Sequence, residues 1–274
     1  GQEPPRRGSL GAQLAAGAVP RDRPAAWMWL LFAALGFLGG QVVAAIFLAV
    51  AAAAEGKTAS LSAIAQLSAP PTWYIVSTLL GIWVGFLGGP LLASFVRGTK
   101  HIVADMGLRF RWADLAGIPI GIGGQFLVVL LYIPIAPHIH NFNQRFEAPS
   151  QRLMGGSHGI GTLVVDVFTV VGAPFFEELF FRGLLLRSLA RLFGTFGGWV
   201  GPTAAVVVTG VLFGLAHVEG LQLLGLAVFG IILSAIAYRT GRLGMNMAAH
   251  ASFNLTAVVA SAVVIPFAGG AIHL

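Results

Sequence analysis

Residues 173–186 read APFFEELFFRGLLL, which places two adjacent carboxylates, Glu177 and Glu178, and one guanidinium, Arg182, among apolar side chains. The sequence on both sides is also apolar, as is typical of a membrane-spanning helix. A charge at the centre of a bilayer costs about 2.5–3.5 kcal/mol on insertion scales, so such residues usually face a protein interior. The stretch therefore predicts a helical membrane protein with a polar centre inside its bundle.

The overall composition agrees with this prediction. The chain is 57% hydrophobic and 9% charged, with a mean hydropathy of +0.85, which excludes an ordinary soluble domain. It has no cysteine, so a disulfide, a thiol nucleophile and a Cys-ligated metal are excluded. The net charge of +6 comes from basic residues scattered between apolar stretches. This pattern indicates a lipid bilayer as partner and no nucleic acid.

Seven stretches are long and apolar enough to cross a membrane as helices of about 20 residues. The predicted fold class is therefore an all-α, polytopic transmembrane bundle of seven spans, or eight if one span is missed. The predicted spans are residues 27–54, 73–96, 115–135, 159–189, 199–218, 221–238 and 245–267. Residues 1–26 are rich in Gly, Pro, Ala and Arg and are predicted to form a disordered cytoplasmic tail. Residues 27–274 form the predicted membrane-embedded domain.

Basic residues predict the orientation of these spans. With the N-terminus inside, thirteen of the 16 Lys and Arg residues lie on the inner side, and only Lys57, Arg145 and Arg152 lie on the other. The positive-inside rule therefore places the N-terminus in the cytoplasm.

Helix geometry places the two glutamates on different faces of their helix. Glu178 and Arg182 are four residues apart and can pair on one helix face, whereas Glu177 points about 100° away from that face. Glu177 can then remain free to act as a general base. The alternative is that all three residues form a buried structural ion network.

Two later motifs add polar side chains at helical spacing. FGLAH places Phe213 and His217 on one helix face, and HASFN does the same for His250 and Asn254. The histidines could ligate a metal, polarise a carbonyl or form an oxyanion pocket. Glu177, His217 and His250 are candidate ligands of Zn²⁺, but the ligand count is small and the chain has no His-Glu-x-x-His motif.

These residues can form one site only if they lie at the same depth in the membrane. Gly197 lies twenty residues from both Glu177 and His217, so a tight hairpin about it brings the two to one level. Straight helices would leave His250 about 20 Å nearer the cytoplasm. Tilted helices, or a TGRLG segment (residues 240–244) that dips into the bundle, are needed to bring it to the site.

Other polar residues and one proline have simpler interpretations. Asp166 lies eleven residues before Glu177 on nearly the same face. It either extends the polar cavity or, as we favour, is a buried acid bonded to Thr162 or Thr169. Pro174 is expected to kink its helix and to open backbone carbonyls toward the cavity. His138, His140 and His158 flank an outer loop; they could bind a metal, but we expect them to be solvated.

EELFFR (from Glu177 to Arg182), FGLAH and HASFN match in order the motifs Glu-Glu-x-x-x-Arg, Phe-x-x-x-His and His-x-x-x-Asn. Over residues 115–260 the chain thus resembles the type II CAAX prenyl endopeptidase and bacteriocin-processing family, known as CPBP or ABI proteins. The resemblance implies an intramembrane protease whose polar cavity opens toward the cytoplasm and which cleaves apolar or lipidated peptides. Both a metalloprotease and a metal-free glutamate mechanism are argued for this family.

The resemblance also implies roles for the site residues. Glu177 would activate water with help from His217, and His250 and Asn254 would stabilise the oxyanion. Glu178 and Arg182 would hold Glu177 in place. The alanine- and glycine-rich composition is typical of a bacterial cytoplasmic membrane protein, so peptide maturation or bacteriocin immunity is the expected role rather than CAAX cleavage.

Two alternatives to a protease remain open at the level of sequence. One is a non-catalytic immunity or partner-binding protein, and the other is a proton-coupled carrier, since intramembrane Glu, His and Asp also form proton relays. A carrier usually shows paired repeats with broken helices in both halves. Here the polar residues all lie in the second half, which favours an enzyme.

Overall fold

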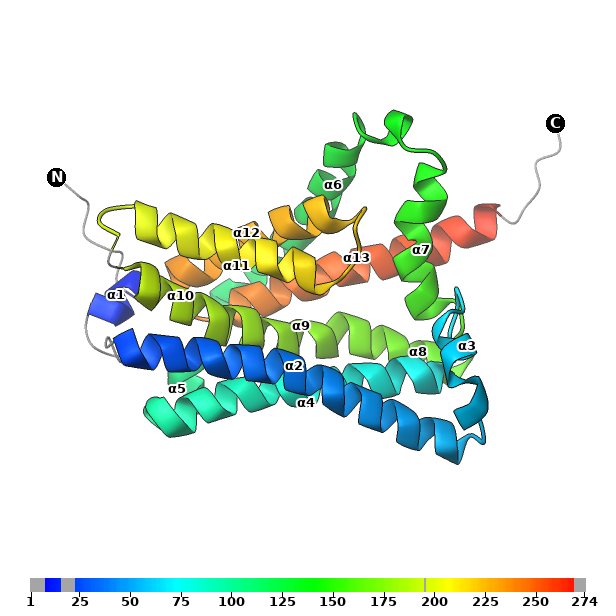
Figure 1. Ribbon diagram of the computed structural model, residues 1–274. Coiled ribbons are helices and arrows are strands. Elements are labelled where there is room, and N and C mark those ends of the chain that lie inside the picture. Colours follow the sequence, from blue (N-terminus) through cyan, green and yellow to red (C-terminus); the bar gives the residue numbers. More distant parts are fainter. Residues whose placement is uncertain (1–7, 16–22, 195, 269–274) are drawn as a thin grey trace.

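The computed structural model describes residues 8–15, 23–194 and 196–268, and these residues form helices and connecting loops with no strand among them. The long helices lie roughly side by side (Figure 1). The helical elements, in chain order, are α1 (Leu10–Ala15), α2 (Arg23–Ala54), η1 (Thr58–Ser60), α3 (Leu61–Ala65), α4 (Thr72–Arg97), α5 (Ile102–Met106), η2 (Trp112–Ala116), α6 (Gly117–Tyr132), η3 (Ala136–His138), α7 (Phe142–Met154), α8 (Ile160–Val167), η4 (Phe168–Gly172), α9 (Ala173–Glu178), η5 (Leu179–Leu185), α10 (Leu186–Phe193), α11 (Val200–Ala216), α12 (Leu223–Thr240) and α13 (Gly244–Ala268).

The predicted helical membrane fold is confirmed. Among the described residues, five helices are long and apolar enough to cross a membrane, namely Ala26–Ala54, Thr72–Arg97, Trp112–Tyr132, Ile160–Phe193 and Leu223–Thr240. The predicted span at 199–218 corresponds to the shorter apolar helix Val200–Ala216. The predicted span at 245–267 corresponds to α13, which has 25 residues but carries Asn246, His250 and Asn254. All seven predicted stretches are therefore helical, and five helices among the described residues are long and apolar enough to cross a membrane.

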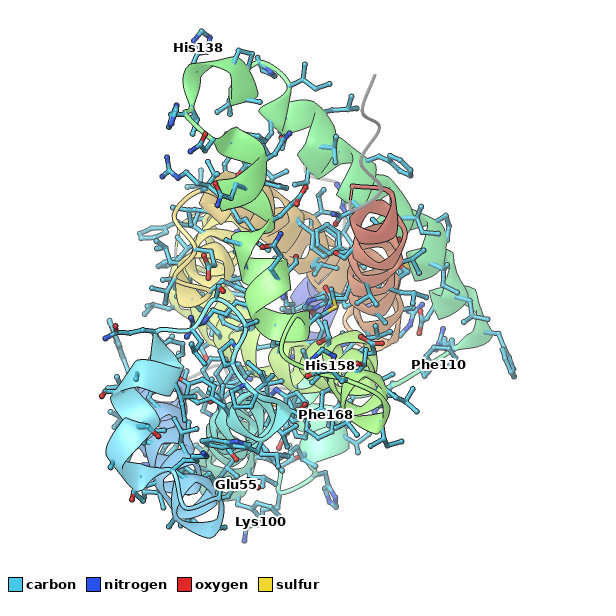
Figure 2. The ribbon with its side chains drawn as sticks, turned by 90° about the vertical axis from the view of Figure 1, so that its right-hand side faces the viewer. Glu55, Lys100, Phe110, His138, His158 and Phe168 are labelled. Carbon is cyan, nitrogen blue, oxygen red and sulfur yellow. The ribbon has the colours of Figure 1, made fainter. Side chains whose placement is uncertain are left out.

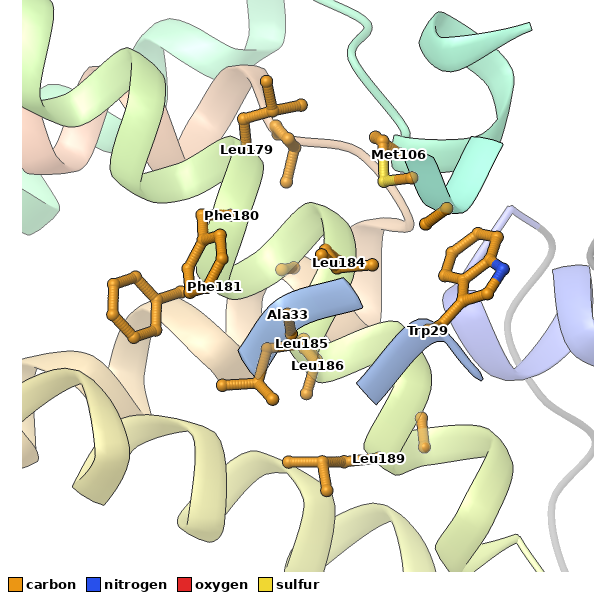
Figure 3. Close-up of a cluster of buried hydrophobic side chains, with 14 of the residues drawn as sticks. Trp29, Ala33, Met106, Leu179, Phe180, Phe181, Leu184, Leu185, Leu186 and Leu189 are labelled. Carbon is orange, nitrogen blue, oxygen red and sulfur yellow. The ribbon is translucent and has the colours of Figure 1, made fainter. Parts of the chain in front are cut away.

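The segment Ile160–Phe193 is the central helix of the bundle, and its second half is completely enclosed. Every residue from Glu178 to Arg191 is buried. Its apolar side chains form the main core with residues of α2, α4, α5, α11 and α12. Figure 3 shows this core around Leu184, with Trp29 and Ala33 contributed by α2 and Met106 by α5. Phe86 of α4 stacks on Phe180 at a centroid distance of 4.4 Å.

Glycines allow α2 and α4 to approach closely. A Cβ added to Gly85 would lie 2.1 Å from the carbonyl oxygen of Gly36 and 2.5 Å from Cα of Gly40. Small residues at such crossings let two helix backbones touch, which is the usual packing mode of membrane helices. The glycines of these helices thus fix the distance between α2 and α4.

The N-terminal region differs from the predicted disordered tail over residues 8–15. These residues include α1, in which Leu10 is 1% exposed within the main core. Gln13 Nε2 donates hydrogen bonds to the carbonyls of Gly8 and Gly241 at 3.0 and 3.1 Å. The buried side chain of Leu10 and the side-chain amide of Gln13 thus anchor this segment, although its composition predicted disorder. Residues 1–7 and 16–22 of the predicted tail lie outside the described residues.

The helix ends gather at two opposite ends of the bundle. The C-terminal ends of α4, α10 and α12 lie with α1 and α5, at the left of Figure 1, and we call this the arginine-rich end. At the right lie α3, α7 and the start of α8, which we call the α7 end. α7 runs across the long helices rather than along them. Figure 2 looks onto this end, where α7 descends from the loop that carries His138 toward His158.

Candidate active site

The central helix is interrupted just before the two glutamates. η4 is a wide, π-helical turn that ends directly before Ala173 and Pro174. Proline has no backbone N–H to donate and its ring clashes with the preceding turn, and a π-helical turn is one way for a helix to absorb this defect. The predicted opening of backbone carbonyls is found here, because the Thr169 carbonyl accepts a hydrogen bond from the side chain of Asn254 at 2.8 Å.

Glu178 is the centre of a buried polar network. Its Oε1 accepts hydrogen bonds from Nη1 of Arg182 at 2.8 Å and from Nδ1 of His250 at 2.9 Å. The side chains of Glu178 and Arg182 are completely buried, and the Arg182 guanidinium also donates to the Gly230 carbonyl at 2.9 Å. The predicted pairing of Glu178 with Arg182 is thus found. Because both charges are out of water, the pair tolerates the loss of neither partner.

Asn246 is a member of this network that the sequence analysis missed. It is fully buried, and its Nδ2 donates to Oε2 of Glu178 at 3.2 Å and to the Leu233 carbonyl at 2.6 Å. The signal was present in the sequence, since Asn246 precedes His250 by four residues and shares its helix face. The network therefore holds both carboxylate oxygens of Glu178, from three different side chains.

Glu177 faces away from this network and toward two imidazoles, as its predicted 100° offset requires. Its Oε2 lies 3.9 Å from Nε2 of His217 and 3.8 Å from Nε2 of His250. The Glu177 side chain is 16% exposed, and its Oε2 is buried without a hydrogen-bond partner among the described residues. Separations of this size are too long for direct hydrogen bonds, and a water molecule is the kind of group that can lie between such polar atoms.

The hydrogen-bond partner of each Nδ1 determines which nitrogen of the neutral imidazole carries the proton. Nδ1 of His217 lies 2.8 Å from the Phe213 carbonyl, which can only accept, so this nitrogen carries a proton. Nδ1 of His250 faces the Glu178 carboxylate and donates in the same way. In the neutral form of each ring, Nε2 therefore presents a lone pair toward Glu177. Two basic nitrogens and one carboxylate oxygen converge on one small volume.

His217 lies at the depth that the hairpin about Gly197 predicted, close to Glu177. His250 also reaches this depth, which straight helices would not allow. The TGRLG segment is buried within the bundle: Leu243 is 1% exposed and its N–H donates to the Gly107 carbonyl at 2.9 Å. Arg242 pairs with Asp114 at 2.6 Å. A buried TGRLG segment agrees with one of the two routes that the sequence allowed, and the contribution of helix tilt stays a prediction.

Phe213 separates the site from the arginine-rich end. Its ring contacts the imidazole of His217 at a centroid distance of 4.7 Å and that of His250 at 5.6 Å. The guanidinium of Arg182 lies 4.4 Å from the same ring centroid, in cation–π contact. Phe213 is fully buried, so it orients both histidines and excludes water from beneath them.

Asn254 lies one helical turn beyond His250 on α13, and its amide is directed to the carbonyl of Thr169 rather than to Glu177. This hydrogen bond ties α13 to η4 of the central helix. The predicted contribution of Asn254 to an oxyanion pocket stays a prediction, since one amide hydrogen remains for a substrate.

The remaining polar residues lie outside this constellation. The hydroxyls of Thr162 and Thr169 donate to the carbonyls of Ser157 and Val165, so the expected pairing with Asp166 is wrong. Asp166 is half-buried. His138 lies at the tip of the loop that leads to α7, whereas His158 precedes α8 (Figure 2). Neither approaches Glu177.

The geometry fits a resident metal ion poorly. Tetrahedral zinc with bonds of 2.0–2.1 Å holds its ligand atoms about 3.3 Å apart, which is shorter than the separations of 3.8 and 3.9 Å between Glu177 and the two histidines. Among the described residues, no group of three or more His, Cys, Asp or Glu side chains is arranged to hold a metal ion. Glu177, His217 and His250 are therefore too far apart to hold zinc in the arrangement observed.

Comparison with known proteins supports the resemblance seen in the three motifs. Residues 159–256 match the profile of a family described as type II CAAX prenyl endopeptidase Rce1-like. This segment runs from the start of the central helix into α13 and contains all the residues of the site described above. Searches of curated proteins and of solved structures gave no significant match. The family match indicates a membrane-embedded protease.

Proposed function

We propose that this protein is an intramembrane endopeptidase in which Glu177 activates a water molecule for attack on a peptide bond. The observation that carries the proposal is the convergence of Glu177 Oε2 with Nε2 of His217 and Nε2 of His250, at 3.9 and 3.8 Å. A carboxylate oxygen that is buried yet without a protein partner is suited to hold and deprotonate water.

In the first step, the water between these groups transfers a proton to Glu177 while its oxygen forms a bond to the carbonyl carbon. The electrons of the carbonyl double bond move to the oxygen and give a tetrahedral oxyanion. His250, when its Nε2 is protonated, can donate to this oxyanion while Glu178 holds its Nδ1–H. The free amide hydrogen of Asn254 is a second candidate donor.

In the second step, the oxyanion collapses and the carbon–nitrogen bond breaks. The leaving nitrogen takes the proton from Glu177, which restores the carboxylate and releases an amine and a carboxylic acid. Glu178 and Arg182 take no part in these proton transfers. Their buried pair fixes the position of His250 and of the helix that carries Glu177.

The proposed substrates are apolar or lipidated peptides. Large apolar side chains on the outer faces of the long helices remain exposed, among them Val171 at 61% and Phe175 at 38% beside the site. In a bilayer these positions face lipid, so a hydrophobic peptide can approach Glu177 through the membrane without crossing water.

The test is cleavage of a library of apolar and prenylated peptides by the detergent-purified protein. Glu177→Gln keeps the shape of the side chain and removes the base, and we expect the rate to fall by about 100-fold or more. Asp166→Asn is the matched control, because it makes the same chemical change in the same helix. We expect it to keep the parent rate.

Metal content, measured on the same samples, separates the two mechanisms. Cleavage that persists after chelation supports the water-activating glutamate alone. Stoichiometric zinc whose removal abolishes cleavage would instead assign Glu177, His217 and His250 as ligands. Folded protein that cleaves no peptide under any condition would overturn the proposal and favour a binding or immunity role.

A further inference from the structure

Basic and aromatic residues alternate in the chain that joins α5 to α6. Residues 109–112 read Arg-Phe-Arg-Trp, and we call them the anchor segment. Arg111, directly before η2, is extended, with φ −133° and ψ 154°. Successive side chains of an extended chain point to opposite sides. The two aromatic side chains should therefore share one side and the two arginines the other, and the rings of Phe110 and Trp112 do contact each other, with centroids 6.5 Å apart.

The aromatic side of the anchor segment lies at the end of a span. Phe110 is 56% exposed and Trp112 is 85% exposed, and Figure 2 shows Phe110 at the outer edge of the molecule. Trp112 is also the first residue of the span Trp112–Tyr132. Exposed aromatic side chains at the end of a span are typical of the headgroup region of a bilayer. We therefore expect this side to insert between lipids.

The arginine side carries positive charge that the protein does not neutralise. Arg109 and Arg111 are exposed, and neither forms an ion pair with any described residue. The two described acids of the arginine-rich end, Asp105 and Asp114, are buried and already hydrogen-bonded. Arg187, whose charge repels that of Arg109, donates to the oxygen of a glutamine side chain and to a backbone carbonyl, which are both neutral. An anion is therefore favoured beside this segment.

An anionic phospholipid fits both sides of the anchor segment. Its phosphate can accept two parallel hydrogen bonds from a guanidinium, while its acyl chains lie beside the exposed rings. A zwitterionic lipid carries the same phosphate, but its cationic group cancels the charge. We therefore expect a preference for a lipid with a net negative charge.

Hydrogen bonds join the anchor segment to the turn that places His250. The N–H of Gly244 donates to the Arg109 carbonyl at 3.1 Å, and the N–H of Arg111 donates to Oδ2 of Asp114 at 2.8 Å. The same carboxylate accepts hydrogen bonds from the guanidinium of the TGRLG segment. The anchor segment therefore supports the beginning of α13, six residues before His250.

We propose that the anchor segment binds the headgroup of an anionic phospholipid, and that the bound lipid stabilises the TGRLG segment and with it the position of His250. Lipid binding is independent of the proposed peptidase function, whereas the effect of the lipid on cleavage rests on that function. The rate of cleavage then depends on the charge of the surrounding membrane.

Binding is tested by thermal unfolding of the full chain in an uncharged detergent with added phosphatidylglycerol or, at the same concentration, phosphatidylcholine. We expect phosphatidylglycerol to give an unfolding temperature about 3 °C or more above that in phosphatidylcholine. The double variant Arg109→Gln, Arg111→Gln should lose most of this difference, because it lacks both guanidiniums but keeps the main-chain hydrogen bonds. The control Lys57→Gln, Arg145→Gln removes the same charge from exposed residues of the α7 end and should keep the difference.

Three results would overturn the proposed lipid site. The first is an equal loss in the two double variants, since net charge alone would then attract the lipid. The second is the same temperature rise when inorganic phosphate replaces the lipid. The third is an equal unfolding temperature of the parent protein in the two lipids.

Hydrogen exchange of residues 240–248 tests the coupling to His250 without any catalytic assay. Replacing phosphatidylcholine by phosphatidylglycerol should slow this exchange about threefold or more in the parent protein but not in the Arg109→Gln, Arg111→Gln variant, and should leave α11 unchanged. With an uncharged peptide as substrate, kcat should rise in parallel. Slower exchange in both proteins, or in neither, would overturn the coupling. Absence of all cleavage, with the exchange slowed as expected, would be a failure of the proposed function alone.

Discussion

The carboxylate of Glu178 accepts a hydrogen bond from Nδ1 of His250 at 2.9 Å, although the two residues lie on different helices and 72 positions apart. Through this contact the central helix and α13 share one buried network, and the free Nε2 of His250 points to Glu177. The contact couples the stability of the bundle to the geometry of the site.

Replacing Glu178 should therefore lower both the stability of the bundle and the rate of cleavage. Glu178→Gln leaves the buried Arg182 without its counter-charge, and we expect a loss of about 3–5 kcal/mol in the free energy of unfolding. Cleavage should fall by about 100-fold or more, since His250 loses its anionic partner. Thermal unfolding in detergent and peptide cleavage measure the two effects. Glu55→Gln, at an exposed site, should change neither, and an unaltered Glu178→Gln protein would refute the structural role of the pair.

Asn246 should prove to be a positioning residue. Asn246→Ala removes the hydrogen bonds to Glu178 and to the Leu233 carbonyl, which is expected to cost about 1–3 kcal/mol. With Glu178 less constrained, kcat should fall while KM stays the same. Ser188→Ala on α10 is the control, because that buried hydroxyl bonds to the Leu184 carbonyl one turn earlier, outside the Glu178 network. If both variants lose kcat equally, the loss reflects a general destabilisation of the bundle, and Asn246 does not specifically position Glu178.

Arg242 and Asp114 should act together to place His250. Their ion pair holds the TGRLG turn where α13 begins, and Asp114 is completely buried. Arg242→Ala leaves that carboxylate without its charged partner and is expected to cost about 1.5–3 kcal/mol of stability, together with part of kcat. A double-mutant cycle with Asp114→Asn measures the coupling. Additive effects of the two substitutions would show that the pair does not hold the turn.

The close approach of α2 and α4 should tolerate no added methyl group at Gly85. Gly85→Ala forces the helices apart at Gly36 and Gly40, and we expect a loss of about 1–3 kcal/mol, as for other overpacked sites. Gly88→Ala, three residues along the same helix, meets no atom within 4 Å and should be neutral. Thermal unfolding of the two variants measures the difference. Equal stability would mean that the interface adjusts.

Features within one helix or one tight hairpin could be predicted from the sequence. The rise and rotation per residue of a helix are nearly constant, so the spacing of Glu178 and Arg182 predicted their pairing. The same geometry predicted the divergence of Glu177 from that pair. The turn around Gly197 joins two adjacent helices, so equal distances along the chain became equal depths for Glu177 and His217. Composition alone was sufficient for the helical membrane fold.

Contacts between distant helices were decided only by the tertiary structure. The depth of His250 depends on how the TGRLG turn packs against Gly107, Arg109 and Asp114, and no local periodicity encodes that packing. Asn246 lies on the same helix face as His250, but its partner Glu178 lies 68 residues away in the sequence. The docking of α1, the bonding of Asn254 to Thr169 and the path of α7 across the long helices likewise depend on surfaces assembled from several helices. Local sequence determines where a helix side chain points, whereas the partner that it meets depends on the crossing and tilt of the whole bundle.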